Sequence, residues 1–136
     1  GKNKERATNN PFIFEKLSSQ FIDNFNGRIT INNKNDVRDY VDIGDINEAI
    51  LSAIKTDKGE SYEIINICSG VGTKLIDVVD LFGKALDKEY EVFSVNSGGA
   101  SISIGVNNKA KKILNWEPKV SLEESIKKMI WQKTEL

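Results

Sequence analysis

The stretch VRDYVDIGDINEAI, residues 37–50, decides the fold of this chain, because a predicted strand and a predicted helix meet within it. Side chains alternate between the two faces of a strand. Val37 and Ile43 therefore fall on an apolar face, while Arg38 and Tyr40 fall on the opposite face. The stretch predicts a strand that presents a cation shortly before a helix begins.

The predicted helix starts where Gly44 ends the strand. Asp45 is expected to cap it, since a carboxylate at this position accepts hydrogen bonds from the first backbone N–H groups. Glu48 follows three residues later, which is the spacing of a capping box. The apolar residues behind this cap keep helical spacing: Ile46, Ala49, Ile50, Ala53 and Ile54.

Arg38 has two interpretations. A guanidinium near a helix N-terminus suits an anionic ligand, because it can donate two parallel hydrogen bonds to a phosphate. Alternatively, Arg38 only forms a surface ion pair with Asp36, Asp39 or Asp42, which contributes little to stability. The residue pattern leaves both interpretations open.

The rest of the chain alternates between strand and helix patterns, which predicts a single α/β domain. Strands are expected over residues 28–32, 62–68, 90–95 and 101–104, and helices from Asn10-Pro11, Leu75, Asn107 and Ser121. The segment SGVGT, residues 69–73, lies between a predicted strand and a helix. It is able to cradle a phosphate, but Leu75 replaces the third glycine of G-x-G-x-x-G, which favours a tight turn capped by Thr73.

Composition narrows the possible functions. The chain has 136 residues, 39% hydrophobic and 29% charged, with a net charge of −1, so it carries no electrostatic signal for nucleic acid or an anionic membrane. It contains no histidine, which removes the commonest general base and metal ligand. A single cysteine and a polar N-terminus without a hydrophobic signal core favour a cytoplasmic location.

The run at 37–50 resembles the RDY-(I/V)-x-V-x-D signature of the extended short-chain dehydrogenase/reductases. These are NAD-dependent nucleotide-sugar epimerases and dehydratases, such as UDP-glucose 4-epimerase. Three further runs resemble family elements in the family's order: INICSG at 65–70, LNWEP at 114–118 and SLEESI at 121–126. The resemblance is to the C-terminal, substrate-side portion of such an enzyme. It implies one substrate-binding domain over residues 1–136, with residues 1–9 as a polar lead-in, that forms the C-terminal part of a Rossmann-type enzyme.

The resemblance also implies a set of substrate-binding residues. By position, Arg38 and Asn10 would reach the diphosphate of a nucleotide-sugar, and the backbone around Thr30 and Asn32 would hold the base. Asn96 stands where the family usually carries the arginine of R-x-G-D, the second cation on the diphosphate. Because a charge-assisted hydrogen bond contributes about 1.5–3 kcal/mol, Arg38 is expected to carry a larger share of the binding.

The catalytic machinery of the family has no counterpart in this sequence. None of Tyr40, Tyr62 and Tyr90 is followed by a lysine four residues later, and no G-x-x-G-x-x-G run is present. We therefore expect no catalytic residue, metal site or cofactor in this chain, with NAD belonging to a full-length parent enzyme. The expected partners are the nucleotide-sugar and an N-terminal dinucleotide-binding half, with self-association through the surfaces that this half would cover.

Two other functions stay open. The chain is alternatively a self-standing, non-catalytic module that binds a sugar nucleotide, an interpretation favoured by Asn96 in place of arginine. It is alternatively a structural or assembly module in which Arg38 is only an ion-pair partner.

Overall fold

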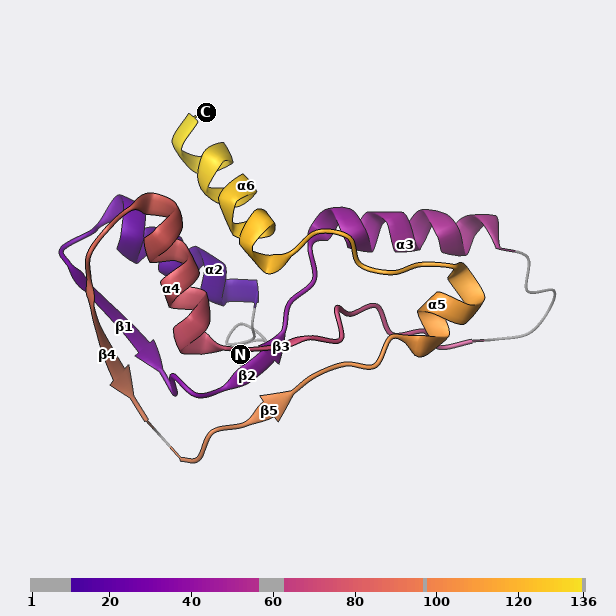
Figure 1. Cartoon of the computed structure of the whole chain (residues 1–136), viewed down its shortest axis with the longest axis horizontal. Coiled ribbons are helices and arrows are strands. Elements are labelled where there is room, and N and C mark those ends of the chain that lie inside the picture. The colour runs from indigo at the N-terminus through magenta and orange to yellow at the C-terminus, as the bar shows by residue number, and fades with distance from the viewer. Residues whose placement is uncertain (1–10, 57–62, 97, 136) are drawn as a thin grey trace, which may run out of the picture.

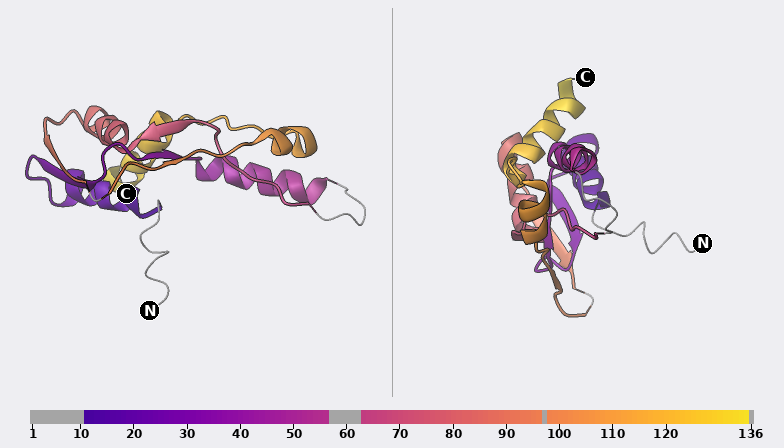
Figure 2. Two further views of the ribbon diagram at one scale, coloured as in Figure 1. Left: turned by 90° about the horizontal axis from the view of Figure 1, so that it is seen from below. Right: turned by 90° about the vertical axis from the view of Figure 1, so that its right-hand side faces the viewer.

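The chain folds into an elongated α/β structure with a hydrophobic core at each end (Figures 1 and 2). The computed structural model describes residues 11–56, 63–96 and 98–135. The elements, in chain order, are α2 (Pro11–Ser18), the π-helix η1 (Ser19–Asp23), β1 (Arg28–Asn32), β2 (Val37–Asp39), α3 (Ile43–Lys55), β3 (Gly72–Lys74), α4 (Leu75–Leu86), β4 (Glu91–Val95), β5 (Ile102–Ser103), α5 (Asn108–Leu114) and α6 (Leu122–Glu135).

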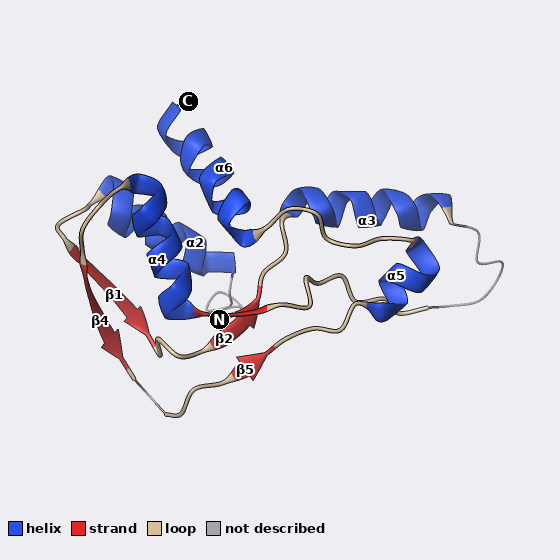
Figure 3. Ribbon diagram, viewed as in Figure 1, coloured by secondary structure: helices blue, strands red, loops and turns tan. Residues whose placement is uncertain are grey.

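The strands form two small sheets, coloured red in Figure 3. β1 and β4 pair in parallel, with Thr30 opposite Phe93. β2 is the central strand of the second sheet, antiparallel to β3 and parallel to β5. Its register places Arg38 opposite Thr73 on one side and Ser103 on the other. The α/β class predicted from the sequence is confirmed.

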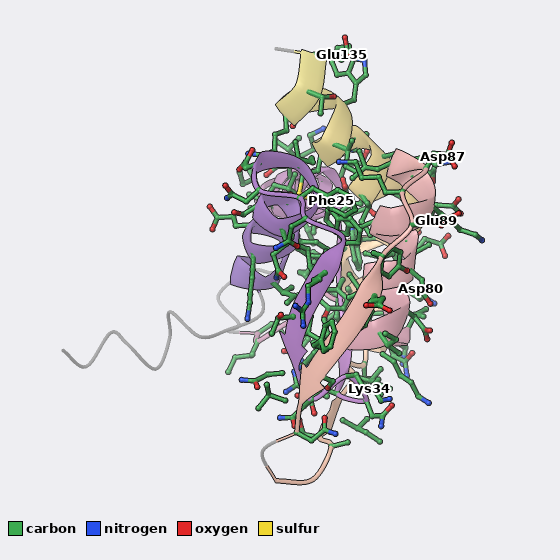
Figure 4. All side chains as sticks on the ribbon, turned by 90° about the vertical axis from the view of Figure 1, so that its left-hand side faces the viewer. Phe25, Lys34, Asp80, Asp87, Glu89 and Glu135 are labelled. Carbon is green, nitrogen blue, oxygen red and sulfur yellow. The ribbon has the colours of Figure 1, made fainter. Side chains whose placement is uncertain are left out.

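The larger core lies where β1 packs against helices α2, η1, α4 and α6. Ile29 and Ile31 of β1 are buried, while Arg28, Thr30 and Asn32 are exposed, as expected of a strand with one apolar face. Phe21 and Phe82 stack at the centre of this core, with ring centroids 5.8 Å apart. Fully burying an aromatic or aliphatic side chain contributes about 1.5–3 kcal/mol, so this cluster dominates the stability of the fold. Figure 4 views this end of the molecule, with β1 and β4 side by side and Lys34 near the end of β1.

The second core holds α3 and α5 together in an arm that extends away from the β1–β4 sheet (Figure 2). Trp116 and Leu114 are buried here against Ala49 and Ala110. Small residues on the two helices let the helices approach Trp116 closely, and the LNWEP run therefore supplies the centre of this core.

The junction between strand and helix differs from the sequence prediction. α3 begins at Ile43, three residues earlier than the predicted first residue Ile46, and its N-cap is Asp42, whose carboxylate accepts from the backbone N–H of Gly44 at 2.8 Å. The predicted capping box of Asp45 and Glu48 is therefore wrong. Asp42 also accepts from Ser125 and Lys128 of α6, so the same carboxylate starts α3 and attaches it to the last helix.

Asp45 has a different role, because it lies inside the first turn of α3 and is only 2% exposed. Its carboxylate accepts hydrogen bonds from the backbone N–H groups of Lys119 and Val120, at 3.1 and 3.0 Å. Its backbone carbonyl accepts from the indole N–H of Trp116 at 2.8 Å. One residue thus fixes the segment between α5 and α6 onto the start of α3.

Two further predictions are corrected by the structure. Residues 63–68 form no ladder with any described strand, although YEIINIC has the composition of a strand; residue 62 lies outside the described residues. Ile65 and Ile67 instead pack into the core of the arm, and a strand cannot form without a neighbouring strand to pair with. Thr73 is not a helix cap, since it belongs to β3, and Lys74 precedes α4.

The capping box at the last helix is confirmed. The hydroxyl of Ser121 accepts from the backbone N–H of Glu124, and the carboxylate of Glu124 accepts from the backbone N–H of Ser121, both at 3.1 Å. These reciprocal bonds satisfy two donors that the first turn of α6 would otherwise leave unpaired. Among the helices that the structure describes, none is both long and apolar enough to span a membrane.

We expect Asp45→Ala to lower the free energy of unfolding by about 2–3 kcal/mol, because two backbone N–H groups lose their acceptor. Urea denaturation followed by circular dichroism measures this change. Glu117→Ala is the matched control, since Glu117 is exposed in the same segment, and it should change stability by less than about 0.5 kcal/mol. Equal effects of the two substitutions would contradict the role assigned to Asp45.

Candidate functional site

The candidate site is centred on β2, where the residue next to Arg38 organises three segments of the chain. The Asp39 carboxylate accepts from the backbone N–H and the hydroxyl of Ser69, at 2.8 and 2.6 Å. It also accepts from the backbone N–H groups of Gly70 and Gly105, at 2.8 and 3.0 Å. Asp39, a polar residue on the otherwise apolar face predicted for this strand, is thus the acceptor that joins β2 to the loop before β3 and to the segment after β5.

The contacts of Asp39 distinguish the two interpretations of the SGVGT segment, which are a phosphate-binding loop and a tight turn. Successive backbone N–H groups in such a loop can bind an anion, and here Ser69 and Gly70 direct theirs to the carboxylate of Asp39. Gly70 has the left-handed φ of +78° that this turn requires, and a Cβ on Gly72 would lie 2.5 Å from the Ile104 side chain. The loop is a tight turn whose backbone N–H groups bind the carboxylate of Asp39, so it does not fit the phosphate of a dinucleotide.

The ionisation of Asp39 reflects these contacts. Burial raises the pKa of the Asp39 carboxyl, but hydrogen bonds from Ser69, Gly105 and Gly70 to the charged form outweigh burial, so the pKa lies below its ordinary value. Nearby, burial and the negative charge of Asp39 raise the pKa of the Cys68 thiol. A raised pKa disfavours the thiolate that a nucleophilic cysteine needs, so Cys68 is a packing residue rather than a nucleophile.

Arg38 lies at the centre of β2 with its side chain 24% exposed. Its Nη1 donates to the carbonyls of Val37 and Ser101, at 2.9 and 3.2 Å, and its Nη2 donates to Oγ of Ser101 at 2.8 Å. A carboxylate oxygen of Asp36 lies 3.9 Å from Nη2. The ion pair considered from the sequence is therefore present with Asp36, but as a longer contact than the bonds to Ser101.

Ser101 is a site residue that the sequence did not reveal. Its backbone N–H donates to Asp36 at 2.9 Å, and its carbonyl accepts from the backbone N–H of Val37 at 2.8 Å. A serine at the edge of a short predicted strand has no distinguishing sequence signal, because its role depends on β5 pairing with β2.

The two residues expected to hold the base lie on β1, in the other sheet, and both are exposed. The backbone of Thr30 already has a partner: its N–H donates to the Gln20 side chain at 2.7 Å, and its carbonyl accepts from the same amide at 3.1 Å. Gln20 belongs to the π-helix, whose wider turn closes with the N–H of Asn24 bound to the carbonyl of Ser19. Asn32, at the end of β1, pairs with Val95 of β4.

The structure places Asn96 directly after β4, exposed, with its side-chain oxygen accepting from the hydroxyl of Ser94 at 2.8 Å. Asn96 and Asn32 thus lie at the same end of the β1–β4 sheet, while Arg38 lies on β2 of the second sheet. Asn10 falls outside the described residues.

A pocket of about 690 Å³ lies between the start of α3 and α6, and Asp39 of β2 is among its lining residues. Its lining includes Phe14, Tyr40, Met129 and Lys128. Tyr40 contacts Phe14 edge-to-face, with ring centroids 5.2 Å apart, and burial raises the pKa of its phenol. None of the four described residues predicted to bind substrate (Thr30, Asn32, Arg38 and Asn96) lines this pocket.

Within the described ranges, no cluster of three or more metal-ligating side chains is found.

Comparison with known proteins gives several nucleotide-sugar epimerases as relatives. The chain is 33% identical over 102 residues to a UDP-glucuronate 4-epimerase from Thermodesulfobacterium geofontis, an alignment that covers 71% of this chain and 30% of the relative. A UDP-glucose 4-epimerase from Rhizobium meliloti is 30% identical over 90 residues, which cover 63% of this chain and 27% of the relative. The chain thus spans about 30% of the length of the curated relatives that it matches. No family model matches the chain.

Solved structures agree with these relatives. The UDP-glucose 4-epimerase of Thermotoga maritima, solved with UDP-glucose, has a TM-score of 0.73 at 30% identity, over 91% of this chain and 40% of that one. The UDP-glucuronic acid 4-epimerase of Bacillus cereus, solved with UDP-glucuronic acid and NAD, has a TM-score of 0.74 over 88% of this chain and 40% of that one. At 23% identity, the second match supports the fold alone.

The low pKa of Asp39 makes stability depend on pH. Because the pKa is lower in the folded state than in the unfolded state, Asp39 stabilises the fold above pH about 4, and this contribution is lost as the pH falls through the folded-state pKa. We expect Asp39→Asn to lower the unfolding free energy at pH 7 by about 1.5–3 kcal/mol. The decline of stability below pH about 5 should also become shallower. Urea denaturation at several pH values checks both effects. Asp77→Asn, at an exposed carboxylate in the first turn of α4, is the control and should lower the unfolding free energy at pH 7 by less than about 1 kcal/mol.

Proposed function

Because this chain is homologous, over part of their length, to NAD-dependent nucleotide-sugar epimerases, we propose that it is a substrate-binding portion of such an enzyme. In this proposal residues 1–136 form the C-terminal domain that holds the nucleotide-sugar. NAD and the catalytic residues belong to a dinucleotide-binding half, and the whole enzyme works in the cytoplasm. The chain alone binds substrate without turning it over.

The observation that carries this proposal is the placement of Arg38. Its guanidinium is half-buried on the central strand of a sheet, and Ser101 fixes its orientation through two hydrogen bonds. A cation whose rotamer is already fixed loses less conformational entropy when it binds a phosphate. The longer contact with Asp36 offsets part of the positive charge of Arg38. A guanidinium has five N–H donors, and the contacts of Arg38 do not use all of them.

The same geometry supports the alternative, a purely structural or assembly module, less well than it supports substrate binding. An arginine needed only for stability would gain most from a short, two-pronged pair with a carboxylate, and the 3.9 Å contact with Asp36 is not of that kind. The backbone ladders of β2 with β3 and β5, together with the hydrogen bonds of Asp39, hold β2 in its sheet through groups other than the Arg38 side chain.

We expect UDP-glucose to bind the chain and Arg38→Ala to weaken that binding by about 1.5–3 kcal/mol, or roughly 10- to 150-fold in Kd, because a charge-assisted contact is lost. Arg38→Lys should restore only part of the affinity, since an ammonium cannot donate to two oxygens in parallel. Asn96→Arg should tighten binding if the bound diphosphate lies within reach of a second cation at residue 96. Titration followed by NMR chemical shifts measures each Kd, including weak ones.

Controls separate binding from folding. Thermal unfolding of each variant should match that of the parent chain within about 2 °C, and titration with NAD should give no saturable shift. Arg28→Ala is the matched control, because Arg28 is an exposed arginine that stacks on Phe93 away from β2. If Arg38→Ala lowered the midpoint of unfolding but left the Kd for UDP-glucose unchanged, Arg38 would be structural and the proposal would fail.

We further propose that the arm contacts the dinucleotide-binding half through one face of α3. Three isoleucines at helical spacing are exposed on this face, namely Ile43 (67%), Ile50 (52%) and Ile54 (74%), and Leu51 lies beside them. The opposite face of the helix packs on the core of the arm through Ala49. Contiguous exposed apolar surface of this kind is typical of an interface.

In the absence of that half, we expect the chain to self-associate at high concentration through this face. Ile50→Lys together with Ile54→Lys should shift the chain towards monomer without lowering its stability, because both side chains are exposed. Sedimentation velocity over a range of concentrations provides the measurement. Ile102→Lys, at a similarly exposed isoleucine on β5, is the control. A chain that is monomeric at every concentration would argue against an interface here.

A further inference from the structure

The guanidinium of Arg38 is oriented by hydrogen bonds to Val37 and Ser101 and by a longer contact with Asp36, and no sequence motif indicated Ser101. We propose that Ser101 is a positioning residue for the phosphate-binding guanidinium of Arg38, and that Asp36 holds Ser101 while limiting the affinity for the anion. This inference rests on the proposed function, since it assigns the environment that prepares Arg38 for a diphosphate.

Ser101 contacts the guanidinium with both of its oxygens. Its carbonyl accepts from Nη1 at 3.2 Å and its hydroxyl accepts from Nη2 at 2.8 Å, so the two bonds fix the plane of the guanidinium as well as its position. A planar fork must meet a phosphate in one plane to donate two bonds at once. Ser101 therefore sets the property on which two-pronged phosphate binding depends.

Ser101 is itself held from two directions. Its backbone N–H donates to Oδ1 of Asp36 at 2.9 Å, and its carbonyl also accepts from the backbone N–H of Val37 at 2.8 Å. The hydroxyl lies 3.4 Å from the same Asp36 oxygen. These bonds connect the segment before β5 to the residues that begin β2, so the hydroxyl of Ser101 has a fixed place beside Arg38.

Asp36 acts on the site through its charge as well as its hydrogen bonds. Its Oδ2 lies 3.9 Å from Nη2, which brings a carboxylate within a few ångströms of any phosphate that the guanidinium binds. Two negative charges at such a separation repel each other, by an amount that decreases as salt is added. Asp36 thus holds the positioning serine and at the same time opposes the ligand.

These two roles predict effects of opposite sign, which a purely structural network would not produce. Ser101→Ala removes one acceptor from Arg38 but keeps the backbone bonds of Ser101, so we expect UDP to bind roughly 3- to 10-fold more weakly at an unchanged midpoint of thermal unfolding. Ser101→Thr keeps the hydroxyl and should restore binding to within about 2-fold of the parent chain.

Asp36→Asn keeps an acceptor for the N–H of Ser101 and removes the charge. The Asp36→Asn variant should bind UDP roughly 2- to 5-fold more tightly than the parent chain at low salt, and this gain in affinity should shrink as salt is added.

The experiment is a titration of the 136-residue chain with UDP, in which the Nε–Hε signal of Arg38 is followed by NMR. The variants are Ser101→Ala, Ser101→Thr, Asp36→Asn, Arg38→Ala and the double variant Arg38→Ala with Ser101→Ala. If Ser101 acts through Arg38, its substitution should have no further effect once Arg38 is alanine. The thermal midpoint of each variant is measured in parallel.

The possible failures are distinguishable. If Arg38→Ala weakens UDP binding and Ser101→Ala does not, the positioning role is wrong and the proposed function stands. The positioning role is also wrong if Ser101→Ala weakens binding equally with and without Arg38. If Asp36→Asn leaves the affinity and its salt dependence unchanged, the charge role of Asp36 is wrong. If Arg38→Ala has no effect on binding, the proposed function itself fails, and this inference with it.

Discussion

The hydrogen bonds of one carboxylate join the loop before β3 and the segment after β5 to the central strand of the second sheet. Asp39 of β2 accepts from Ser69, Gly70 and Gly105, and these bonds add to the ladders that pair β2 with β3 and β5. Even partial burial of a carboxylate is costly unless its oxygens accept hydrogen bonds, and those of half-buried Asp39 accept mainly from backbone N–H groups. Because Arg38 is the preceding residue, the bonds that satisfy Asp39 also determine where the only cation on β2 lies.

The sequence predicted most of the elements, and the errors share a physical cause. β1, α4 and the capping box of α6 depend on local patterns, and all were found where those patterns indicated. The start of α3 was misplaced because Asp42 and Asp45 are equally good caps by local rules. Only contacts with distant residues distinguish them, since Asp45 is needed as an acceptor for the segment before α6.

The candidate site was predictable only in part, for the same reason. Arg38 was identified because it lies in a recognisable motif, whereas Ser101 became visible only when β5 was paired with β2. Residues 63–68 show the reverse case, in which a strand-like composition met no partner strand in the described structure. Local sequence determines what a segment can become, and its neighbours in space determine what it does become.

The contact between Gln20 and Thr30 has a consequence for solubility. β1 is paired with β4 along one edge, and at Thr30 the amide of Gln20 occupies the donor and the acceptor of the other edge. An uncovered edge of this kind is a template on which a second chain can add a strand. A single side chain, presented by a widened turn of helix, therefore protects the middle of β1 from the intermolecular pairing that begins a fibril.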